Sequence, residues 1–280
     1  MDILSAIMAG IIQGATEFLP VSSSGHLALY RAFSGADFDG AGVAFDVFLH
    51  LGTLFAVCAV YRKDVSKLIR GCFSGLGKLI RGKAGHGFDE YERLAFYVFV
   101  ATLPLALLAL LGADDAVEAA SLHPAVIGAA LICTGFVLLF SEKAGGGMKT
   151  LSEITLKSAL AVGVCQAAAI MPGLSRSGCT VSGGLLNKFD RESAVRFSFL
   201  ISIPAIIGAN VLKLPAAVSD GAFSDNVIYY ITGFVSSALS GFLSIKLLVF
   251  ITKKAKLSYF SYYCFALGAF AVIYEIFNLT

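Results

Sequence analysis

The sequence predicts an all-α integral membrane protein with an inverted-topology repeat, six full transmembrane helices and two re-entrant helical hairpins. Composition is the first observation behind this fold class, since 57% of the 280 residues are hydrophobic and only 14% are charged. Such a chain is typical of proteins embedded in lipid, which excludes an ordinary soluble domain. The formal net charge of only +2 gives no sign of a nucleic-acid partner, so no nucleic acid is expected to bind.

Six apolar runs are the second observation. An α-helix needs about 20 residues to cross a hydrocarbon layer of about 30 Å. Runs close to this length occupy residues 43–61, 94–111, 123–140, 194–212, 227–250 and 258–278. Polar connections separate most of them, so each run is predicted to be a separate span.

The connections between these runs alternate in charge. The loop from Arg62 to Arg93 holds eight Lys and Arg residues, and its stretch "GKLIRGKAGHG", residues 77–87, is interpreted as a solvated basic loop. The alternate connections carry acidic residues, namely Asp37, Asp39, Asp114, Asp115, Glu118, Asp220 and Asp225. Basic connections tend to stay in the cytoplasm. The C-terminus is therefore predicted to lie outside.

Two interrupted segments, residues 3–33 and 154–189, are the third observation. In the first, an apolar run reaches Pro20 and then a stretch of serines and glycine, which break a helix. The returning arm has about 11 residues, or about 16 Å of helix, enough to climb about halfway through a membrane. Each segment is predicted to be a re-entrant hairpin; one long kinked helix is the alternative.

The two predicted hairpins are copies of each other. A shift of 153 residues places Gly10, Gln13, Ala15, Ser22, Ser24 and Gly25 over Gly163, Gln166, Ala168, Ser175, Ser177 and Gly178. Three spans follow each hairpin, and because three is odd the second copy is inverted. The repeats are residues 1–142 and 152–280, within one compact membrane domain. Hairpins that enter from opposite faces can meet near the midplane and form a binding site.

The hairpin tips carry groups suited to an anion. Ser22 and Ser175 are placed to cap the returning helices, whose first N–H groups and positive dipole ends attract negative charge. Arg176 lies at the second tip, where its guanidinium suits two oxygens of a phosphate. These features make phosphate the leading ligand.

The first tip adds groups with reactive chemistry. Ser22 and Ser23 precede His26 by four and three residues, which places hydroxyl and imidazole on nearly one helical face, like a nucleophile and its base. Gln13 and Glu17 are also four apart, and their oxygens suit a Mg²⁺ or Ca²⁺ that bridges a diphosphate. A simple hinge at the serines, and a buried ion pair between Glu17 and Arg176, are the structural alternatives.

These motifs carry a family resemblance that covers the whole chain. "QGATEFLPVSSSGH" and "PGLSRSGCT" are similar to the two signature motifs of the undecaprenyl-diphosphate phosphatase family, also called bacitracin-resistance proteins, and "RFSFLISIPA" resembles the same family. The resemblance implies removal of the terminal phosphate of a C55 polyprenyl diphosphate, which recycles the lipid carrier of peptidoglycan synthesis and confers bacitracin resistance. It also implies a divalent cation, the bacterial cell membrane and an active site open to the outer face.

The same resemblance assigns roles to residues at the tips. Glu17 and Gln13 would place the cation, although many members have Glu where this chain has Gln13. Ser23 would attack phosphorus with help from His26, while activated water and direct attack by His26 stay open. The residues expected to bind the phosphates are Arg176, Ser175, Ser177 and Thr180, with Ser22 capping the helix beside them.

The sequence leaves alternatives open for the function and for two further polar residues. A secondary transporter or flippase for a phosphorylated lipid or an organic anion would explain an inverted repeat equally well. Asp46 and His50, four residues apart at the start of a span, are interpreted as a solvated interfacial pair rather than as support for the site. Membrane lipids are the expected surroundings, and the sequence leaves monomer and homodimer open.

Overall fold

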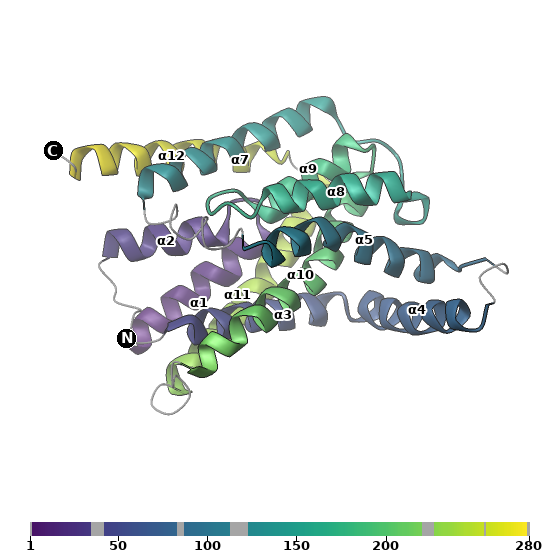
Figure 1. Cartoon of the computed structure of the whole chain (residues 1–280). Coiled ribbons are helices and arrows are strands. Elements are labelled where there is room, and N and C mark those ends of the chain that lie inside the picture. Colours follow the sequence, from purple (N-terminus) through teal and green to yellow (C-terminus); the bar gives the residue numbers. More distant parts are fainter. Residues whose placement is uncertain are drawn as a thin grey trace.

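The computed structural model describes the chain as a bundle of helices, and the described parts contain no β-strand (Figure 1). The described residues are 2–34, 42–82, 87–112, 123–219, 227–254 and 256–278. The helices of the first half are α1 (Ile3–Phe18), α2 (Ser23–Ser34), α3 (Gly42–Val60), α4 (Arg62–Ile80), α5 (Glu90–Leu110) and α7 (Pro124–Ala144). Those of the second half are the short 3₁₀ helix η2 (Leu151–Glu153), then α8 (Leu156–Ala168), α9 (Arg176–Leu186), α10 (Arg191–Ser219), α11 (Val227–Lys254) and α12 (Ser258–Asn278).

Six of these helices are long and apolar enough to cross a membrane by length and composition. The candidate spans are Val43–Val60, Glu90–Leu110, Pro124–Ala144, Arg191–Pro215, Val227–Thr252 and Ser258–Phe277. Each contains most of one predicted apolar run, so the prediction of an all-α, multi-pass membrane protein is confirmed. The acidic residues expected in the alternate connections lie outside the described residues.

Four shorter helices make up the two interrupted segments. Helices α1, α2, α8 and α9 have 16, 12, 13 and 11 residues, each fewer than the roughly 20 that a span needs. Helix α1 contacts α2, and α8 contacts α9. In Figure 1, α1 and α2 extend from the middle of the molecule toward the end that carries both termini, whereas α8 and α9 extend toward the opposite end. Each interrupted segment is thus a pair of helices whose turn lies in the interior.

The prediction of a loop from Arg62 to Arg93 is wrong for Arg62–Ile80, which form the 19-residue helix α4. The rest of the stretch "GKLIRGKAGHG" is a turn at Arg81 and Gly82, followed by residues 83–86, which lie outside the described residues. Helix α4 packs on α5 at Gly71, where an added Cβ would come within 2.6 Å of the carbonyl oxygen of Tyr91. The buried Glu92 of α5 also binds α4, since it accepts hydrogen bonds from Lys78 at 2.6 Å and Ser74 at 2.7 Å. These contacts stabilise a helix where charge alone indicated a solvated loop.

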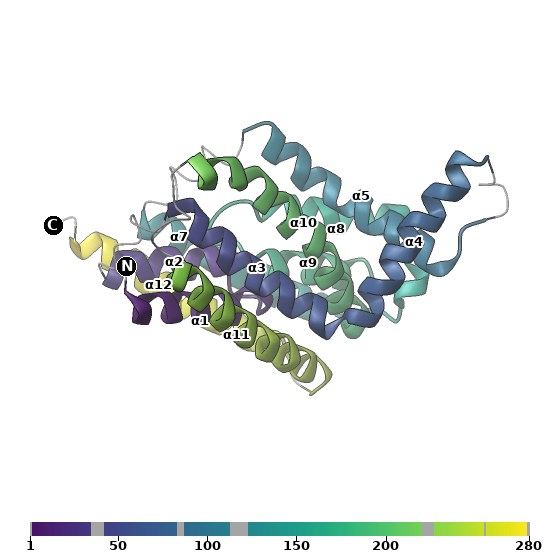
Figure 2. The same cartoon turned by 90° about the horizontal axis from the view of Figure 1, so that it is seen from below.

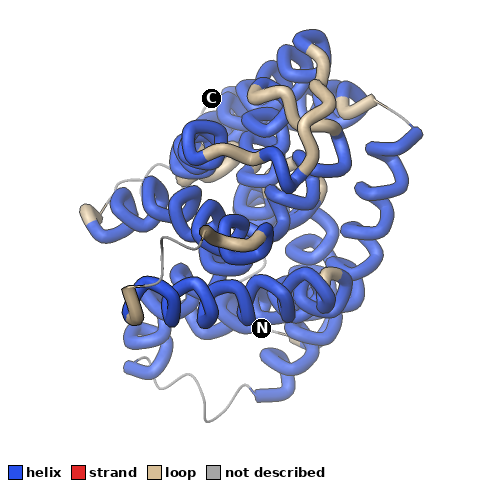
Figure 3. The backbone as a smooth tube through the Cα atoms, turned by 90° about the vertical axis from the view of Figure 1, so that its right-hand side faces the viewer, coloured by secondary structure: helices blue, strands red, loops and turns tan. Residues whose placement is uncertain are grey.

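The core connects the first tip to the second half of the chain. Phe18, the last residue of α1, packs edge to face on Phe199 of α10, with ring centroids 5.4 Å apart. Many large apolar side chains face outward instead, as expected for helices surrounded by lipid; Phe55, Phe99 and Phe136 are examples. Figures 2 and 3 show the same arrangement from two further directions, with most of the described chain in helices and short loops between them.

Candidate active site

The two hairpin tips touch in the interior of the bundle. A Cβ on Gly25 would come within 3.0 Å of the Cα atom of Gly173, and the hydroxyl of Ser177 donates to the carbonyl of Leu19 at 3.0 Å. A larger side chain at Gly25 would displace the second tip, and one at Gly173 would meet Ile127 and Ala130 of α7. Residues about 150 positions apart therefore share one location.

Two serines cap the returning helices, as the repeat predicts. Ser22 Oγ accepts a hydrogen bond from the N–H of Gly25 at 3.3 Å, and Ser175 Oγ accepts one from the N–H of Gly178 at 3.0 Å. The two caps are related by the 153-residue shift. Their backbones differ, because Ser22 has φ 72° whereas Ser175 has φ −80°. A non-glycine residue at positive φ is strained, a feature that often accompanies functional sites.

Glu17 is the hydrogen-bonding centre of the site. Its carboxylate is only 7% exposed and forms an ion pair with Arg176 of the opposite tip. The hydroxyl of Ser23 donates to Oε2 of the same carboxylate at 2.5 Å, and the amide of Gln13 donates to it at 3.0 Å. A buried carboxylate is costly without such partners. The Glu17–Arg176 pair, one of the alternatives considered from sequence, is present.

The amide oxygen of Gln13 lies beside this carboxylate without a hydrogen-bond partner of its own. Gln13 is fully buried, and its Oε1 is one of four buried side-chain atoms in the described ranges that have no partner. An orphaned oxygen next to a carboxylate fits a hard cation. No cluster of three or more His, Cys, Asp or Glu occurs among the described residues. A cation here would need further oxygens from a substrate.

His26 does not bond to Ser23, the partner expected from sequence. Its Nδ1 is 2.7 Å from the carbonyl oxygen of Ser22, which can only accept, so Nδ1 carries the proton and donates. The other nitrogen, Nε2, lies 2.7 Å from the hydroxyl of Tyr263 in α12 and therefore accepts from it. The two rings also stack, with centroids 5.6 Å apart. Two neighbours thus fix the tautomer of His26.

Tyr263 was missed by the sequence analysis. It lies 237 residues from His26, in the stretch "SYFSYYCF" at the start of the last span. Tyrosines at such a position usually mark the membrane interface. No spacing in the sequence distinguishes Tyr263 from Tyr262, its neighbour, so the contact could be found only from the fold.

The remaining residues of the second tip hold its backbone in place. Ser175 donates its N–H to Thr134 of α7 at 3.0 Å. The hydroxyl of Thr180 bonds to Ser198 of α10 at 2.5 Å and to the carbonyl of Arg176 at 2.8 Å. The hydroxyl of Ser177 donates to the carbonyl of Leu19 in the first tip. Among the residues expected to bind phosphate at this tip, Arg176 alone is not buried.

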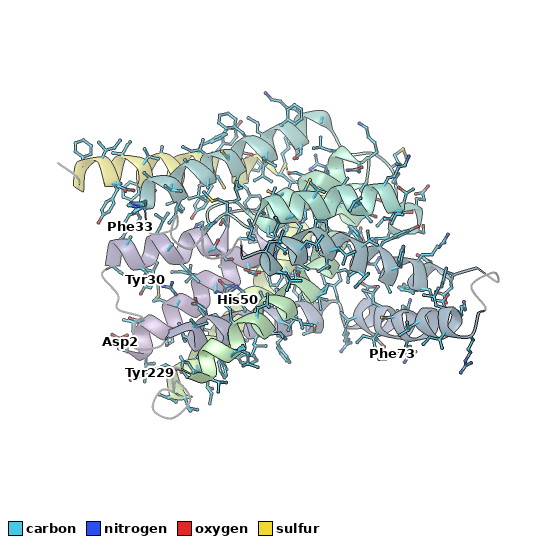
Figure 4. The ribbon with its side chains drawn as sticks, viewed as in Figure 1. Asp2, Tyr30, Phe33, His50, Phe73 and Tyr229 are labelled. Carbon is cyan, nitrogen blue, oxygen red and sulfur yellow. The ribbon has the colours of Figure 1, made fainter. Side chains whose placement is uncertain are left out.

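Asp46 and His50 do not bond to each other through their side chains. The carboxylate of Asp46 pairs with Arg31 at 2.9 Å, while Nδ1 of His50 donates to the carbonyl of Asp46 at 2.8 Å. His50, labelled in Figure 4, is half-buried. The side chains of Asp46 and His50 thus have separate partners.

Comparisons with known proteins agree with the motifs at the tips. A family model described as "Bacitracin resistance protein BacA" matches residues 6–270. Proteins named undecaprenyl-diphosphatase from Methanobrevibacter smithii and Methanosphaera stadtmanae are each 40% identical, and the alignments cover 100% and 99% of both chains. One from Rubrobacter xylanophilus is 40% identical over 96% of this chain and 97% of its own. The chain belongs to the bacitracin resistance protein BacA family.

Proposed function

We propose that this chain is an undecaprenyl-diphosphate phosphatase, a membrane hydrolase that converts undecaprenyl diphosphate into undecaprenyl phosphate and inorganic phosphate. The names of its relatives support this activity and the polyprenyl diphosphate substrate. One observation carries the proposal for the site: the buried carboxylate of Glu17 holds both the hydroxyl of Ser23 and the guanidinium of Arg176. A base, a nucleophile and an anion-binding group thus lie in contact.

Substrate binding would rearrange this contact. The phosphate oxygens of a diphosphate compete with Glu17 for the guanidinium of Arg176, whose fork suits two of them. When Arg176 turns to the substrate, Oε1 of Glu17 is released to hold a cation, while Oε2 still accepts the hydroxyl of Ser23 and acts as its base. Arg176 in turn stabilises the charge that develops on the leaving oxygen.

The chemical step then begins at Ser23. Its oxygen attacks the terminal phosphorus, the bond from that phosphorus to the bridging oxygen breaks, and the serine proton passes to Glu17. Undecaprenyl phosphate leaves with the bridging oxygen. Water next attacks the phosphoserine and releases inorganic phosphate, while Glu17 returns its proton to Ser23. His26, whose Nε2 accepts a hydrogen bond from Tyr263 before substrate binds, takes the proton of that water once Tyr263 has moved aside.

Glu17 and Gln13 are the residues that would hold a divalent cation, Mg²⁺ or Ca²⁺. Glu17 supplies a carboxylate, and Gln13 supplies the buried Oε1 that has no protein partner. Such a cation, when bound, neutralises phosphate charge and makes phosphorus a better electrophile. Two protein ligands leave the remaining positions to phosphate oxygens and water, as is common for Mg²⁺.

The arrangement of the helices supports an inverted repeat with re-entrant hairpins. In such a repeat the helices of the first half, α1, α2, α3, α5 and α7, correspond in order to those of the second half, α8, α9, α10, α11 and α12. The contact of α1 with α11 then has its counterpart in the contact of α8 with α5. Both contacts are extensive. The glycines follow the same rule: an added Cβ on Gly10 would come within 2.7 Å of a backbone oxygen of α11, and one on Gly163 within 2.5 Å of a backbone oxygen of α5. Both hairpins thus use the same close packing.

Charge supports the orientation in the membrane. The basic residues of α4 and of the start of α10 lie at one end of the bundle, and the termini lie at the other (Figure 1). With the basic end in the cytoplasm, the C-terminus is outside. The first hairpin enters from the outer face, so a site at its tip is reached from that face.

A detergent assay tests this function against the transporter alternative. Hydrolysis needs no second compartment, so purified protein in non-ionic detergent should release phosphate from undecaprenyl diphosphate in the presence of Mg²⁺ or Ca²⁺. A mock preparation from cells that lack this chain is the blank for a contaminating phosphatase. If the parent preparation releases no more phosphate than this blank, the chain is not the hydrolase proposed here.

A further inference from the structure

A polar cavity lies at the end of the bundle that carries α4. It has a volume of about 640 Å³ and lies where α3 ends and α5 and α10 begin, beside the last turns of α11. None of the hairpin-tip residues lines it. A cavity of this size is large enough for a lipid headgroup or another small ligand.

Positive charge predominates in this cavity. Five basic side chains, from Arg62, Lys63, Lys67, Arg196 and Lys246, line it together with two acidic ones, from Asp64 and Glu192. Arg196 forms an ion pair with Asp64 through both its Nε and an Nη nitrogen. The lining therefore has an excess of three positive charges.

Lys246 is unusual because it interrupts an apolar span. It lies in α11 within the candidate span Val227–Thr252, and its ammonium is 4.3 Å from the ring centroid of Phe242. A basic residue inside a span is costly unless it faces polar surroundings, and it commonly marks a binding site. Here it faces the cavity rather than lipid alone.

Helix α4, whose first residues line the cavity, carries an exposed apolar stripe. Ile69, Phe73, Leu76 and Ile80 form one stripe along it, each more than half exposed, at the spacing of a single helical face. Phe73 on this face is labelled in Figure 4. Lys63, Lys67 and Arg70 follow another face. An apolar stripe beside a basic face is the pattern of helices that contact the membrane interface.

We propose that this cavity binds the phosphate headgroup of an anionic lipid from the leaflet at the basic end of the bundle. The apolar stripe of α4 contacts the lipid beside the cavity, and Lys63 at the start of α4 and Lys246 near the end of α11 hold the phosphate. Basic pockets between membrane helices on the cytoplasmic side recognise such headgroups. The site is separate from the diphosphate site at the hairpin tips, and it does not depend on the proposed function.

Thermal unfolding of the purified full chain in dodecyl maltoside tests the proposal. Phosphatidylglycerol should raise Tm of the parent by a few degrees, whereas phosphatidylcholine and inorganic phosphate at equal concentration should not. The double variant Lys63→Gln/Lys246→Gln should lose more than half of the shift. The matched control is Lys143→Gln/Lys157→Gln, which removes the same charge from the same end outside the cavity, and it should keep the shift.

Two results would overturn the proposal. Equal loss of the Tm shift in both double variants would mean that phosphatidylglycerol binding depends on the overall charge of this end and not on the cavity. An equal shift with inorganic phosphate, lost in the cavity variant, would mean a site for free anions rather than for a lipid. Phosphate release by the same preparations is a separate measurement, so failure here leaves the hydrolase proposal standing.

Discussion

Glu17 and Arg176 form an ion pair across 159 positions of sequence, one from each hairpin tip. The pair accounts for a carboxylate within an apolar run and for a guanidinium deep in the second hairpin. Each neutralises the other before substrate arrives, and a phosphate can take the place of the carboxylate on Arg176.

Arg176→Lys should lower kcat/KM by roughly 100-fold or more, because Lys keeps the charge but loses the fork that holds two oxygens. Arg191→Lys is the matched control, since Arg191 pairs with Glu142 away from the tips. Initial rates of phosphate release measure both. Near-parent turnover of Arg176→Lys would mean that Arg176 serves the fold and not the reaction.

Ser23→Ala should reduce kcat by about a thousandfold or more, as expected when a nucleophile is lost. Ser24→Ala should stay near the parent rate. Ser24 is exposed, and its hydroxyl makes a long hydrogen bond of 3.4 Å to the hydroxyl of Ser22. Stopped assays under saturating substrate compare the two. A modest loss in Ser23→Ala, equal to that of Ser24→Ala, would favour attack by water or by His26.

Tyr263→Phe should lower kcat by about five- to tenfold with little change in KM, the effect of losing one neutral hydrogen bond to His26. The ring stack with His26 survives in this variant. Tyr262→Phe makes the same change at the adjacent, more exposed tyrosine and should leave kcat unchanged. A rise in KM alone would assign Tyr263 to lipid binding instead of positioning His26.

Gly163→Ala should destabilise the protein by about 1–3 kcal/mol, because the new Cβ would come within 2.5 Å of the carbonyl oxygen of Ala101 and separate α8 from α5. Gly77→Ala in α4 meets no atom within 4 Å and should be neutral or slightly stabilising. Thermal unfolding in detergent measures both. Equal Tm values for Gly163→Ala and the parent would contradict close packing of the second hairpin on α5.

The sequence predicted the spans and the tips because both depend on local signals. Long apolar runs have few alternatives to a membrane helix, and proline, serines and glycine interrupt a helix wherever they gather. The helix α4 was missed because its apolar residues stand among eight basic residues of the Arg62–Arg93 stretch, so the charge suggested solvent. The sequence also does not show the contacts that hold α4 against α5, such as the close approach of Gly71 to the backbone of Tyr91.

The pairing of side chains at the site depended on tertiary structure. Helical spacing placed Ser23 and His26 on one face, but that spacing does not decide which neighbour each side chain bonds. The carbonyl of Ser22 and the hydroxyl of Tyr263 occupy the ring nitrogens of His26, and Glu17 takes the hydroxyl of Ser23. Only the meeting of α1, α2 and α12 produces these contacts.

The central claim is that Glu17 joins both tips into one hydrolytic, cation-dependent site. The direct measurement is phosphate release from undecaprenyl diphosphate across a Mg²⁺ or Ca²⁺ titration for the parent, Glu17→Gln and Gln13→Ala, with Tm confirming that each variant is folded. Glu17→Gln should lose at least about 100-fold at ordinary cation concentration and recover part of it at high concentration, because a hard cation gains most from an anionic ligand. Gln13→Ala should be milder. If Glu17→Gln keeps the parent rate and the parent cation dependence, Glu17 is neither base nor ligand, and the account of the site is wrong.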